Sequence, residues 1–179
     1  MKHFPLSAAA LACLLLAQCK KADPDPAEQL PPATQTGAGT FGCLVNGQPY
    51  TPAGRVGLGS NFDVNYDPGY LGGTLDISTY KAKADVYQSV GISGTNIARV
   101  GAYTFGSTSG LFGLFIDYNR STPCDWYVAR DTGTYSRGKL TITRLDNQAG
   151  IVSGTFAFTL YKAGCDSLRV TDGRFDYHL

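Results

Sequence analysis

Hydrophobic and polar residues alternate with a period of two in the C-terminal part of the chain. In Thr155–Tyr161, Phe156 and Phe158 fall on one side of an extended backbone while small and hydroxyl residues fall on the other. This alternation predicts a half-buried strand. Lys139–Leu145 alternates in the same way, so residues 146–150 between the two runs are expected to form a hairpin loop.

Shorter runs of the same kind recur from Phe41 onwards. Asn46-Gly47 between two of them is the strongest hairpin signal in the chain, and Asp172-Gly173 predicts a turn or bulge near the end. A short helix over Ala82–Val90 is the alternative prediction to a strand in this segment. The remaining predicted strands are Phe41–Val45, Gln48–Thr51, Phe62–Tyr66, Thr74–Tyr80, Val86–Ile92, Leu111–Tyr118, Asp125–Arg130, Leu168–Thr171 and Arg174–Tyr177.

The composition supports strands over helices. After Thr40 every acidic residue is Asp, a poor helix former, and the only glutamate of the chain is Glu28. Glycines are frequent at intervals that suit turns and bulges. About ten strands separated by short turns predict an all-β fold, an antiparallel β-sandwich. A closed antiparallel β-barrel is the alternative.

The N-terminus has the layout of a secretory signal. Lys2 and His3 precede an apolar stretch that, at about 14 residues, is too short to span a bilayer as a helix. It ends Leu16-Ala17-Gln18-Cys19, which resembles the lipobox of bacterial lipoproteins although Gln18 departs from the usual small residue. We predict a signal peptide over residues 1–18 and acylation of Cys19, which would anchor the protein to a lipid bilayer. A plain secretory signal is the alternative.

The segment after Cys19 is rich in proline and has no apolar periodicity. Residues 19–40 are therefore expected to be a flexible tether, able to extend about 60 Å at about 3.1 Å per residue. Residues 41–179 form a single predicted domain. If Cys19 is lipidated, three cysteines remain in a compartment that permits disulfides. We favour a bridge between Cys124 and Cys165, which both lie in turn-like segments, and a free thiol at Cys43.

Four motifs carry a resemblance to a known family, and they are Thr40–Gly47, Gly138–Asp146, Ser153–Phe158 and Thr171–Asp176. With the lipobox and the proline-rich segment, they resemble a Bacteroidota lipoprotein family of unknown function. The resemblance implies an all-β domain in the cell envelope, at the periplasmic or surface face of the outer membrane. The family has no established catalytic residue to carry over to this chain. The resemblance covers both ends of the chain better than the middle.

The charge and the histidine content argue against several function classes. A formal net charge of +1 lacks the basic surplus that nucleic-acid binding needs. Once the signal is removed, His178 is the only histidine, next to the chain end and poorly placed for a catalytic base. No metal or cofactor motif is present in the sequence, so we predict no cofactor, no metal site and no catalytic residue.

Paired aspartates support an enzymatic function as an alternative hypothesis. An Asp-dependent hydrolase would need two carboxyls about 5–10 Å apart, and Asp63 with Asp67 or Asp117 with Asp125 are the candidates. Asp63 and Asp67 also alternate with Asn65 as calcium ligands sometimes do, but the glycine and the distal glutamate of an EF-hand loop are absent. A plain turn before Pro68 is the simpler interpretation of these residues.

Aromatic residues carry the binding hypothesis. They make up 12% of the chain, and Tyr118 and Trp126 lie beside predicted turns. Tyr and Trp stack apolar faces while their polar tips stay in water, which suits sugar rings or a protein partner. We therefore expect a lipid-anchored, non-catalytic binding or structural module of the bacterial envelope, with a glycan or an envelope protein as partner. A glycan-binding module is the more specific alternative.

Overall fold

The computed structural model describes residues 24–55, 57, 59–106, 108–119 and 122–179. Most of this chain is strand, and two short 3-10 helices, η2 (Pro26–Gln29) and η3 (Pro123–Asp125), interrupt it. The strands are β1 (Thr40–Val45), β2 (Gln48–Tyr50), β3 (Phe62–Asp67), β4 (Thr74–Lys83), β5 (Val86–Gly94), β6 (Gly101–Phe105), β7 (Leu111–Asp117), β8 (Trp126–Val128), β9 (Thr134–Asp146), β10 (Ile151–Lys162) and β11 (Leu168–His178).

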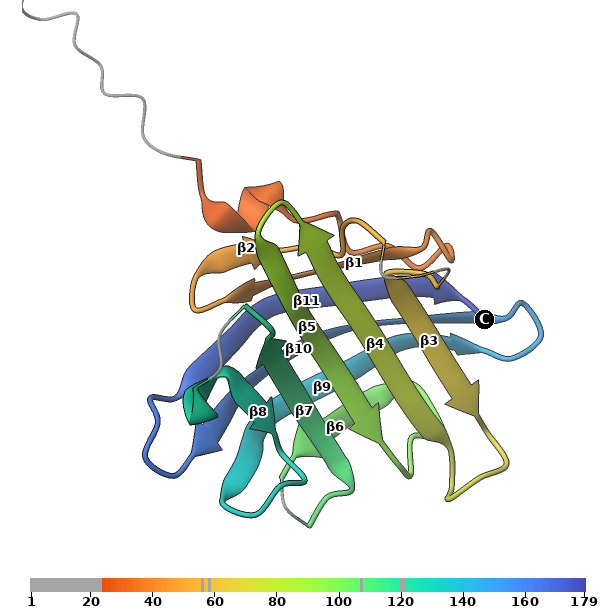
Figure 1. Cartoon of the computed structure of the whole chain (residues 1–179). Coiled ribbons are helices and arrows are strands. Elements are labelled where there is room, and N and C mark those ends of the chain that lie inside the picture. The colour runs from red at the N-terminus through yellow and green to blue at the C-terminus, as the bar shows by residue number, and fades with distance from the viewer. Residues whose placement is uncertain (1–23, 56, 58, 107, 120–121) are drawn as a thin grey trace, which may run out of the picture.

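The strands form two antiparallel sheets that pack face to face. One sheet has the order β2-β1-β11-β10-β9-β6 and the other the order β3-β4-β5-β7-β8. Figure 1 shows the five-stranded sheet in front, its strands crossing those of the six-stranded sheet at a large angle. The all-β sandwich predicted from the sequence is confirmed, and the two sheets do not close into a barrel.

The core lies between the sheets and is built from the alternating inward positions of both. Phe41 of β1 contacts Phe62 of β3 and Phe156 of β10, with ring centroids 5.6 and 5.4 Å apart. Phe105 and Phe158 pack in the same layer, with centroids 4.8 Å apart. Aromatic pairs in these offset and tilted geometries stabilise a core beyond the area they bury.

Local sequence signals explain most of the turns. Asn46 and Gly47 both adopt positive φ, 49° and 79°, as a two-residue hairpin turn requires. The alternative helix over Ala82–Val90 is wrong, because this segment is the β4–β5 hairpin, with Ala84 at φ 52° in its turn. The predicted break at Asp172-Gly173 is a bulge inside the single strand β11, where the register with β10 shifts. β6 was not predicted.

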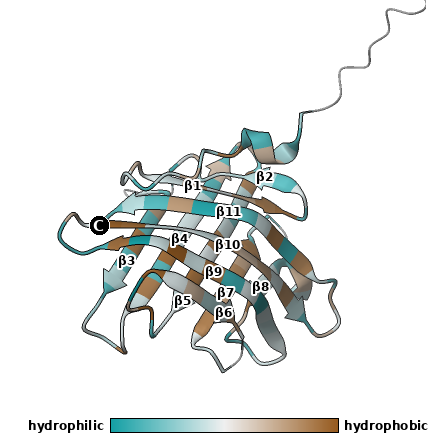
Figure 2. Ribbon diagram, turned by 180° about the vertical axis from the view of Figure 1, so that it is seen from behind, coloured by the Kyte–Doolittle hydropathy of each residue, from teal (hydrophilic) through white to brown (hydrophobic). Residues whose placement is uncertain are grey.

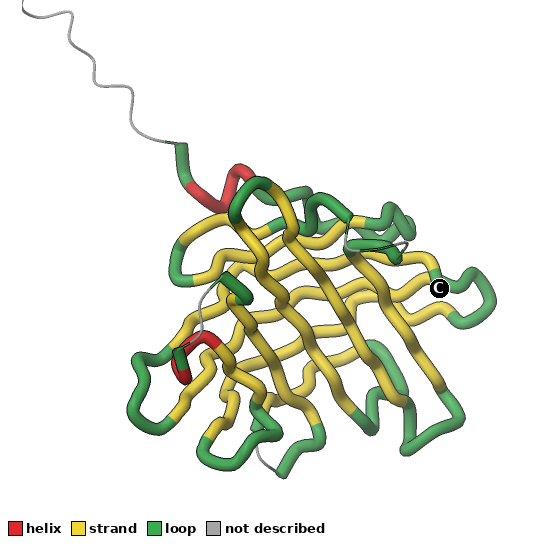
Figure 3. The backbone as a smooth tube through the Cα atoms, in the orientation of Figure 1, coloured by secondary structure: helices red, strands yellow, loops and turns green. Residues whose placement is uncertain are grey.

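The predicted flexible tether differs from the structure in its second half. Residues 30–39, which we call the strap, lie against the outer side of the six-stranded sheet. Figure 3 shows the strap as the loop between η2 and β1. Leu30 is buried, and the buried carboxylate of Asp176 on β11 accepts hydrogen bonds from the strap. Local composition could not reveal this, because the acceptor lies about 140 residues away in the sequence. The strap donors are Thr34 Oγ1, Thr36 N, Thr36 Oγ1, Gly37 N and Ala38 N.

The predicted signal peptide over residues 1–18 and the lipidation site Cys19 lie outside the described residues. Within the described part of the chain, no helix has the length and apolar character needed to cross a membrane.

Candidate functional site

Four exposed aromatic side chains gather on the outer face of the five-stranded sheet. Tyr80, Tyr87, Tyr118 and Trp126 are 38%, 51%, 46% and 45% exposed. Both residues predicted from the sequence, Tyr118 and Trp126, belong to this group, and their rings make an edge-to-face contact with centroids 5.6 Å apart. We call the four residues the aromatic platform.

The strand register brings the platform together. Tyr80 of β4 is opposite Ser89 of β5, Ser89 is opposite Ile116 of β7, and Ile116 is opposite Trp126 of β8. Directly opposed residues share one face of a sheet, so Tyr80 and Trp126 are the two ends of one cross-strand row.

A second row runs beside the first. Ala82 is opposite Tyr87, and the backbone N–H of Tyr118 donates to the carbonyl of Tyr87 at 2.8 Å. The start of β5 is fixed to the loop after β7, because Tyr87 N donates to Asn119 Oδ1 at 2.7 Å. The platform therefore spans four strands.

A depression of about 300 Å³ lies between the tyrosines. Its lining is almost entirely apolar, and Ala82 is the small residue that leaves room among the rings. Burial raises the pKa of Tyr118 above its ordinary value, and the nearby Tyr80 adds to that shift. The Tyr118 hydroxyl is therefore neutral at physiological pH and can act as a hydrogen-bond donor. The lining residues are Tyr80, Lys81, Ala82, Tyr87, Gln88 and Tyr118.

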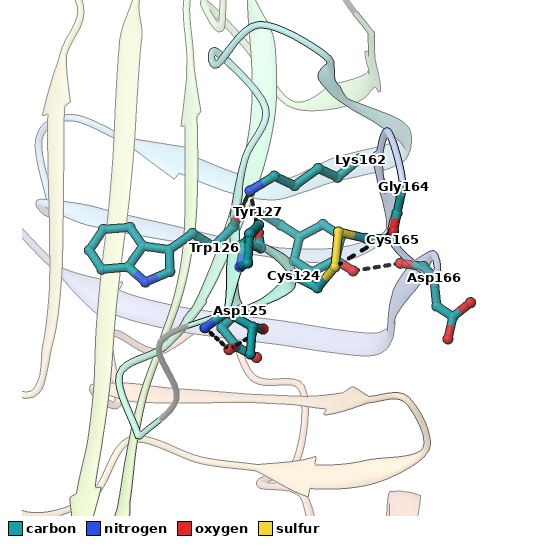
Figure 4. Close-up of a disulfide and its surroundings, with 10 residues drawn as sticks. Cys124, Asp125, Trp126, Tyr127, Lys162, Gly164, Cys165 and Asp166 are labelled. Atoms are coloured by element: carbon teal, nitrogen blue, oxygen red, sulfur yellow. Dashed lines mark hydrogen bonds between the residues drawn. A yellow bond between two sulfur atoms is a disulfide. The ribbon is translucent and has the colours of Figure 1, made fainter.

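The end of the platform that carries Trp126 is braced from behind (Figure 4). A disulfide joins Cys124, two residues before Trp126, to Cys165 in the β10–β11 loop, which is the pairing favoured from the sequence. Lys162 Nζ donates to the carbonyl of Trp126 at 2.8 Å, and Tyr127 Oη donates to the carbonyl of Asp166. The indole of Trp126 points away from these contacts. The short strand β8 is thus held to the opposite sheet while its indole stays exposed.

The acidic candidates on β3 do not converge. Asp63 and Asp67 lie four residues apart along this strand, with exposed side chains, so about 13 Å of extended backbone separates them. Asp63 accepts a hydrogen bond from Tyr177 Oη at 3.0 Å, and Asp67 accepts one from the N–H of Gly69 at 2.8 Å. The segment is the predicted strand followed by a turn at Pro68 and Gly69, and the strand does not wrap around a central point as a calcium loop does.

Asp117 and Asp125 line one cleft of about 470 Å³ at the end of the sandwich. Both carboxylates are already engaged. Asp117 accepts from Gln88 Nε2 and from the N–H of Asn119, each at 3.0 Å, and Asp125 Oδ2 accepts from the N–H and the hydroxyl of Thr122. This cleft is separate from the aromatic depression, although Lys81 and Gln88 touch both.

The remaining chemical candidates are isolated from one another. His178 is exposed, and its Nδ1 lies 3.2 Å from the carbonyl oxygen of Leu179. Cys43 is a free thiol that is fully buried, and this burial raises its pKa strongly. Among the described residues, no group of three or more His, Cys, Asp or Glu side chains could hold a metal ion.

Sequence reasoning missed Tyr80 and Tyr87. Each lies on a predicted strand, where a tyrosine on the surface is ordinary, and no local pattern separates them from other strand residues. The register of β4, β5 and β7 places them beside Tyr118 and Trp126. Only the strand order identifies Tyr80 and Tyr87 as part of the platform.

The comparisons with known proteins found no similarity. No protein-family model, curated protein or solved structure matches this chain significantly.

Proposed function

We propose that this chain is a non-catalytic carbohydrate-binding module of the bacterial envelope, held at a membrane by acylation of Cys19. The observation that carries the binding role is the aromatic platform, four exposed rings on one sheet face around an apolar depression of about 300 Å³. Tyr and Trp rings pack against the apolar faces of sugars while the sugar hydroxyls remain in water.

Several features support a carbohydrate over other ligands. The platform presents aromatic rings that have little conformational freedom, which lowers the entropic cost of binding. The depression is lined by no acidic residue, which favours binding over acid–base hydrolysis.

Acylation of Cys19 would hold the domain close to the membrane. If Cys19 carries the lipid, only five peptide units connect it to Pro24, the first described residue, and they reach at most about 18 Å. The strap is bound to the domain. The maximum distance between the domain and the membrane would therefore be much shorter than the reach of about 60 Å that a flexible tether over residues 19–40 would give.

A glycan array tests the binding role. Full-length protein purified in mild detergent is expected to bind a defined set of neutral glycans. Trp126→Ala and Tyr118→Ala are each expected to lower that binding about tenfold, because each removes a stacking surface that contributes roughly 1–2 kcal/mol. Tyr135→Ala is the matched control, since Tyr135 is also exposed but lies on the six-stranded sheet.

Two results would contradict the proposal. One is binding that both platform substitutions leave unchanged. The other is the absence of binding to every glycan, combined with self-association that Trp126→Ala abolishes. That second result would assign the apolar face to assembly with a protein partner, since exposed apolar patches also mark protein interfaces.

A further inference from the structure

A second site lies on the opposite side of the molecule. We propose that the outer face of the six-stranded sheet binds an acidic polysaccharide, a sugar chain that carries carboxylate groups at intervals. The site is a trough along β10, with a floor of short side chains and cationic side chains on both walls. It is independent of the aromatic platform, and Figure 2 views the molecule from this side.

The floor of the trough follows from the alternation along β10. Thr155, Ala157 and Thr159 occupy the outward positions of this strand, and the large apolar residues between them are buried in the core. β10 lies between β9 and β11, so longer side chains on these two neighbours rise above the floor on either side.

The walls carry four cations at positions that the register defines. Thr159 is opposite Arg137 of β9 and opposite Arg169 of β11. Ala157 is opposite Lys139 of β9, and Thr155 is opposite Arg174 of β11. The cationic groups therefore extend from Thr155 to Thr159 of β10, about 13 Å along the strand. A single small anion could not contact all of them.

These cations lack acidic partners. Among the described residues, the only ion pair joins Arg144 to Asp146, at the far end of β9. Arg174 donates to the carbonyls of Asp172 and Pro31, and Arg137 lies over the ring of Tyr135, 5.5 Å from its centroid. Neither contact neutralises the charge.

The trough is hollowed at the end that holds Thr155 and Ala157. A depression of about 490 Å³ is lined by residues of the floor and both walls, including Lys139, Thr155 and Arg174, together with Ala33 of the strap. Asp172 also lines it and is the one carboxylate there. A ligand with widely spaced charges can avoid Asp172, whereas a densely charged polymer such as nucleic acid would be repelled by it.

The shape of the trough fits a linear polymer better than a membrane surface. A bilayer is broad and flat and would touch only the ends of the wall side chains, while a linear polymer can enter the trough and reach the threonine hydroxyls of the floor. Those hydroxyls both donate and accept hydrogen bonds, as sugar hydroxyls do. Cationic walls and a hydroxyl floor together fit a sugar polymer with carboxylate groups.

The test is a titration of full-length protein in mild detergent with polygalacturonate, followed by affinity electrophoresis at several salt concentrations. Binding is expected at low salt and should weaken as ionic strength rises. The double variant Arg137→Ser/Lys139→Ser should bind about tenfold more weakly, at roughly threefold for each exposed charge. Asp172→Asn should bind about twofold more tightly, since Asn tolerates the positive φ of 51° at this position.

The matched control is Arg55→Ser/Lys83→Ser, which removes the same charge from exposed positions outside the six-stranded sheet and should leave the affinity unchanged. Emission of Trp126 on the other face should also stay constant during this titration, which separates the trough from the platform. Polygalacturonate binding that is absent, or equal in both double variants, would overturn the proposal. Binding to phosphatidylglycerol vesicles in place of polygalacturonate would overturn the choice of a sugar polymer.

Discussion

Asp176 is the residue that fixes the strap to the sandwich, and Asp176→Asn tests this role. Its side chain is 1% exposed and accepts five hydrogen bonds from the strap, at 2.7–3.2 Å, and a sixth from Ser153 Oγ at 2.6 Å. Asparagine keeps the shape but removes the charge, and it turns an NH2 group toward donors that need an acceptor.

The expected loss of stability follows from these contacts. A hydrogen bond to a charged group contributes about 1.5–3 kcal/mol, and the substitution removes at least two of them. The freed strap donors regain hydrogen bonds to water once the strap detaches, which limits the total to about 3 kcal/mol. For a domain of this size each kcal/mol shifts the melting temperature by about 2–4 °C, so a decrease of roughly 6–12 °C is expected.

The same residue predicts a pH dependence. Burial alone would raise the pKa of Asp176, but hydrogen bonds from Ser153, Thr34 and the backbone of Thr36 and Ala38 outweigh it and hold the pKa well below its usual range. A carboxyl with a lowered folded-state pKa stabilises the fold fully above its unfolded value of about 3.9. That stability is lost as the pH falls from there through the folded pKa.

Thermal unfolding followed by circular dichroism at pH 7 and at pH 3 measures both effects. The difference between wild type and Asp176→Asn should be larger at pH 7 than at pH 3, and protease cleavage within residues 30–39 should be faster in the variant. Asp172→Asn is the control, an exposed aspartate of the same strand whose substitution should change stability by less than about 0.5 kcal/mol. A variant that melts with the wild type at pH 7 and resists cleavage would refute this role of Asp176.

Three further predictions concern the cysteines. Cys43 should resist thiol reagents in the native protein and react only after unfolding, because it is fully buried and its pKa is strongly raised by that burial; rapid native labelling in a colorimetric thiol assay would contradict this. Replacing Cys124 and Cys165 with Ser removes a bridge that spans 41 residues, and it should lower the free energy of unfolding by about 4 kcal/mol in a denaturant titration. Glycan binding at Trp126 should weaken as well. An unchanged unfolding midpoint would argue against the bridge. Cys19→Ala should move the protein from the membrane fraction to the soluble fraction and abolish incorporation of labelled palmitate, whereas a wild-type protein that incorporates none would contradict the anchor.

The fold was predictable where the signals are local. Alternation over Thr155–Tyr161 predicted β10, and Asn46-Gly47 predicted the β1–β2 turn, because side-chain periodicity and positive φ are properties of adjacent residues. β6 was missed, since its five residues begin with Gly101, are followed by Gly106 and offer too short an alternation. The order of the strands within each sheet had no local signal at all.

The candidate site was predictable only in part for the same reason. Tyr118 and Trp126 stood out because they adjoin turns, but the contribution of Tyr80 depends on pairing between β4, β5, β7 and β8. The strap was wrongly predicted to be flexible, because its composition resembles a linker and its partner, Asp176, is remote in sequence. Contacts of this kind become visible only in three dimensions.

Trp126 is the only tryptophan of the chain and belongs to the aromatic platform, so its fluorescence reports on the proposed site directly. The decisive measurement is its emission and acrylamide quenching during titration with a neutral glycan that the full-length protein binds. A ligand that stacks on the platform should shift the emission to shorter wavelength and protect the indole from quenching. Saturable binding with unchanged emission and unchanged quenching would place the sugar elsewhere and contradict the account.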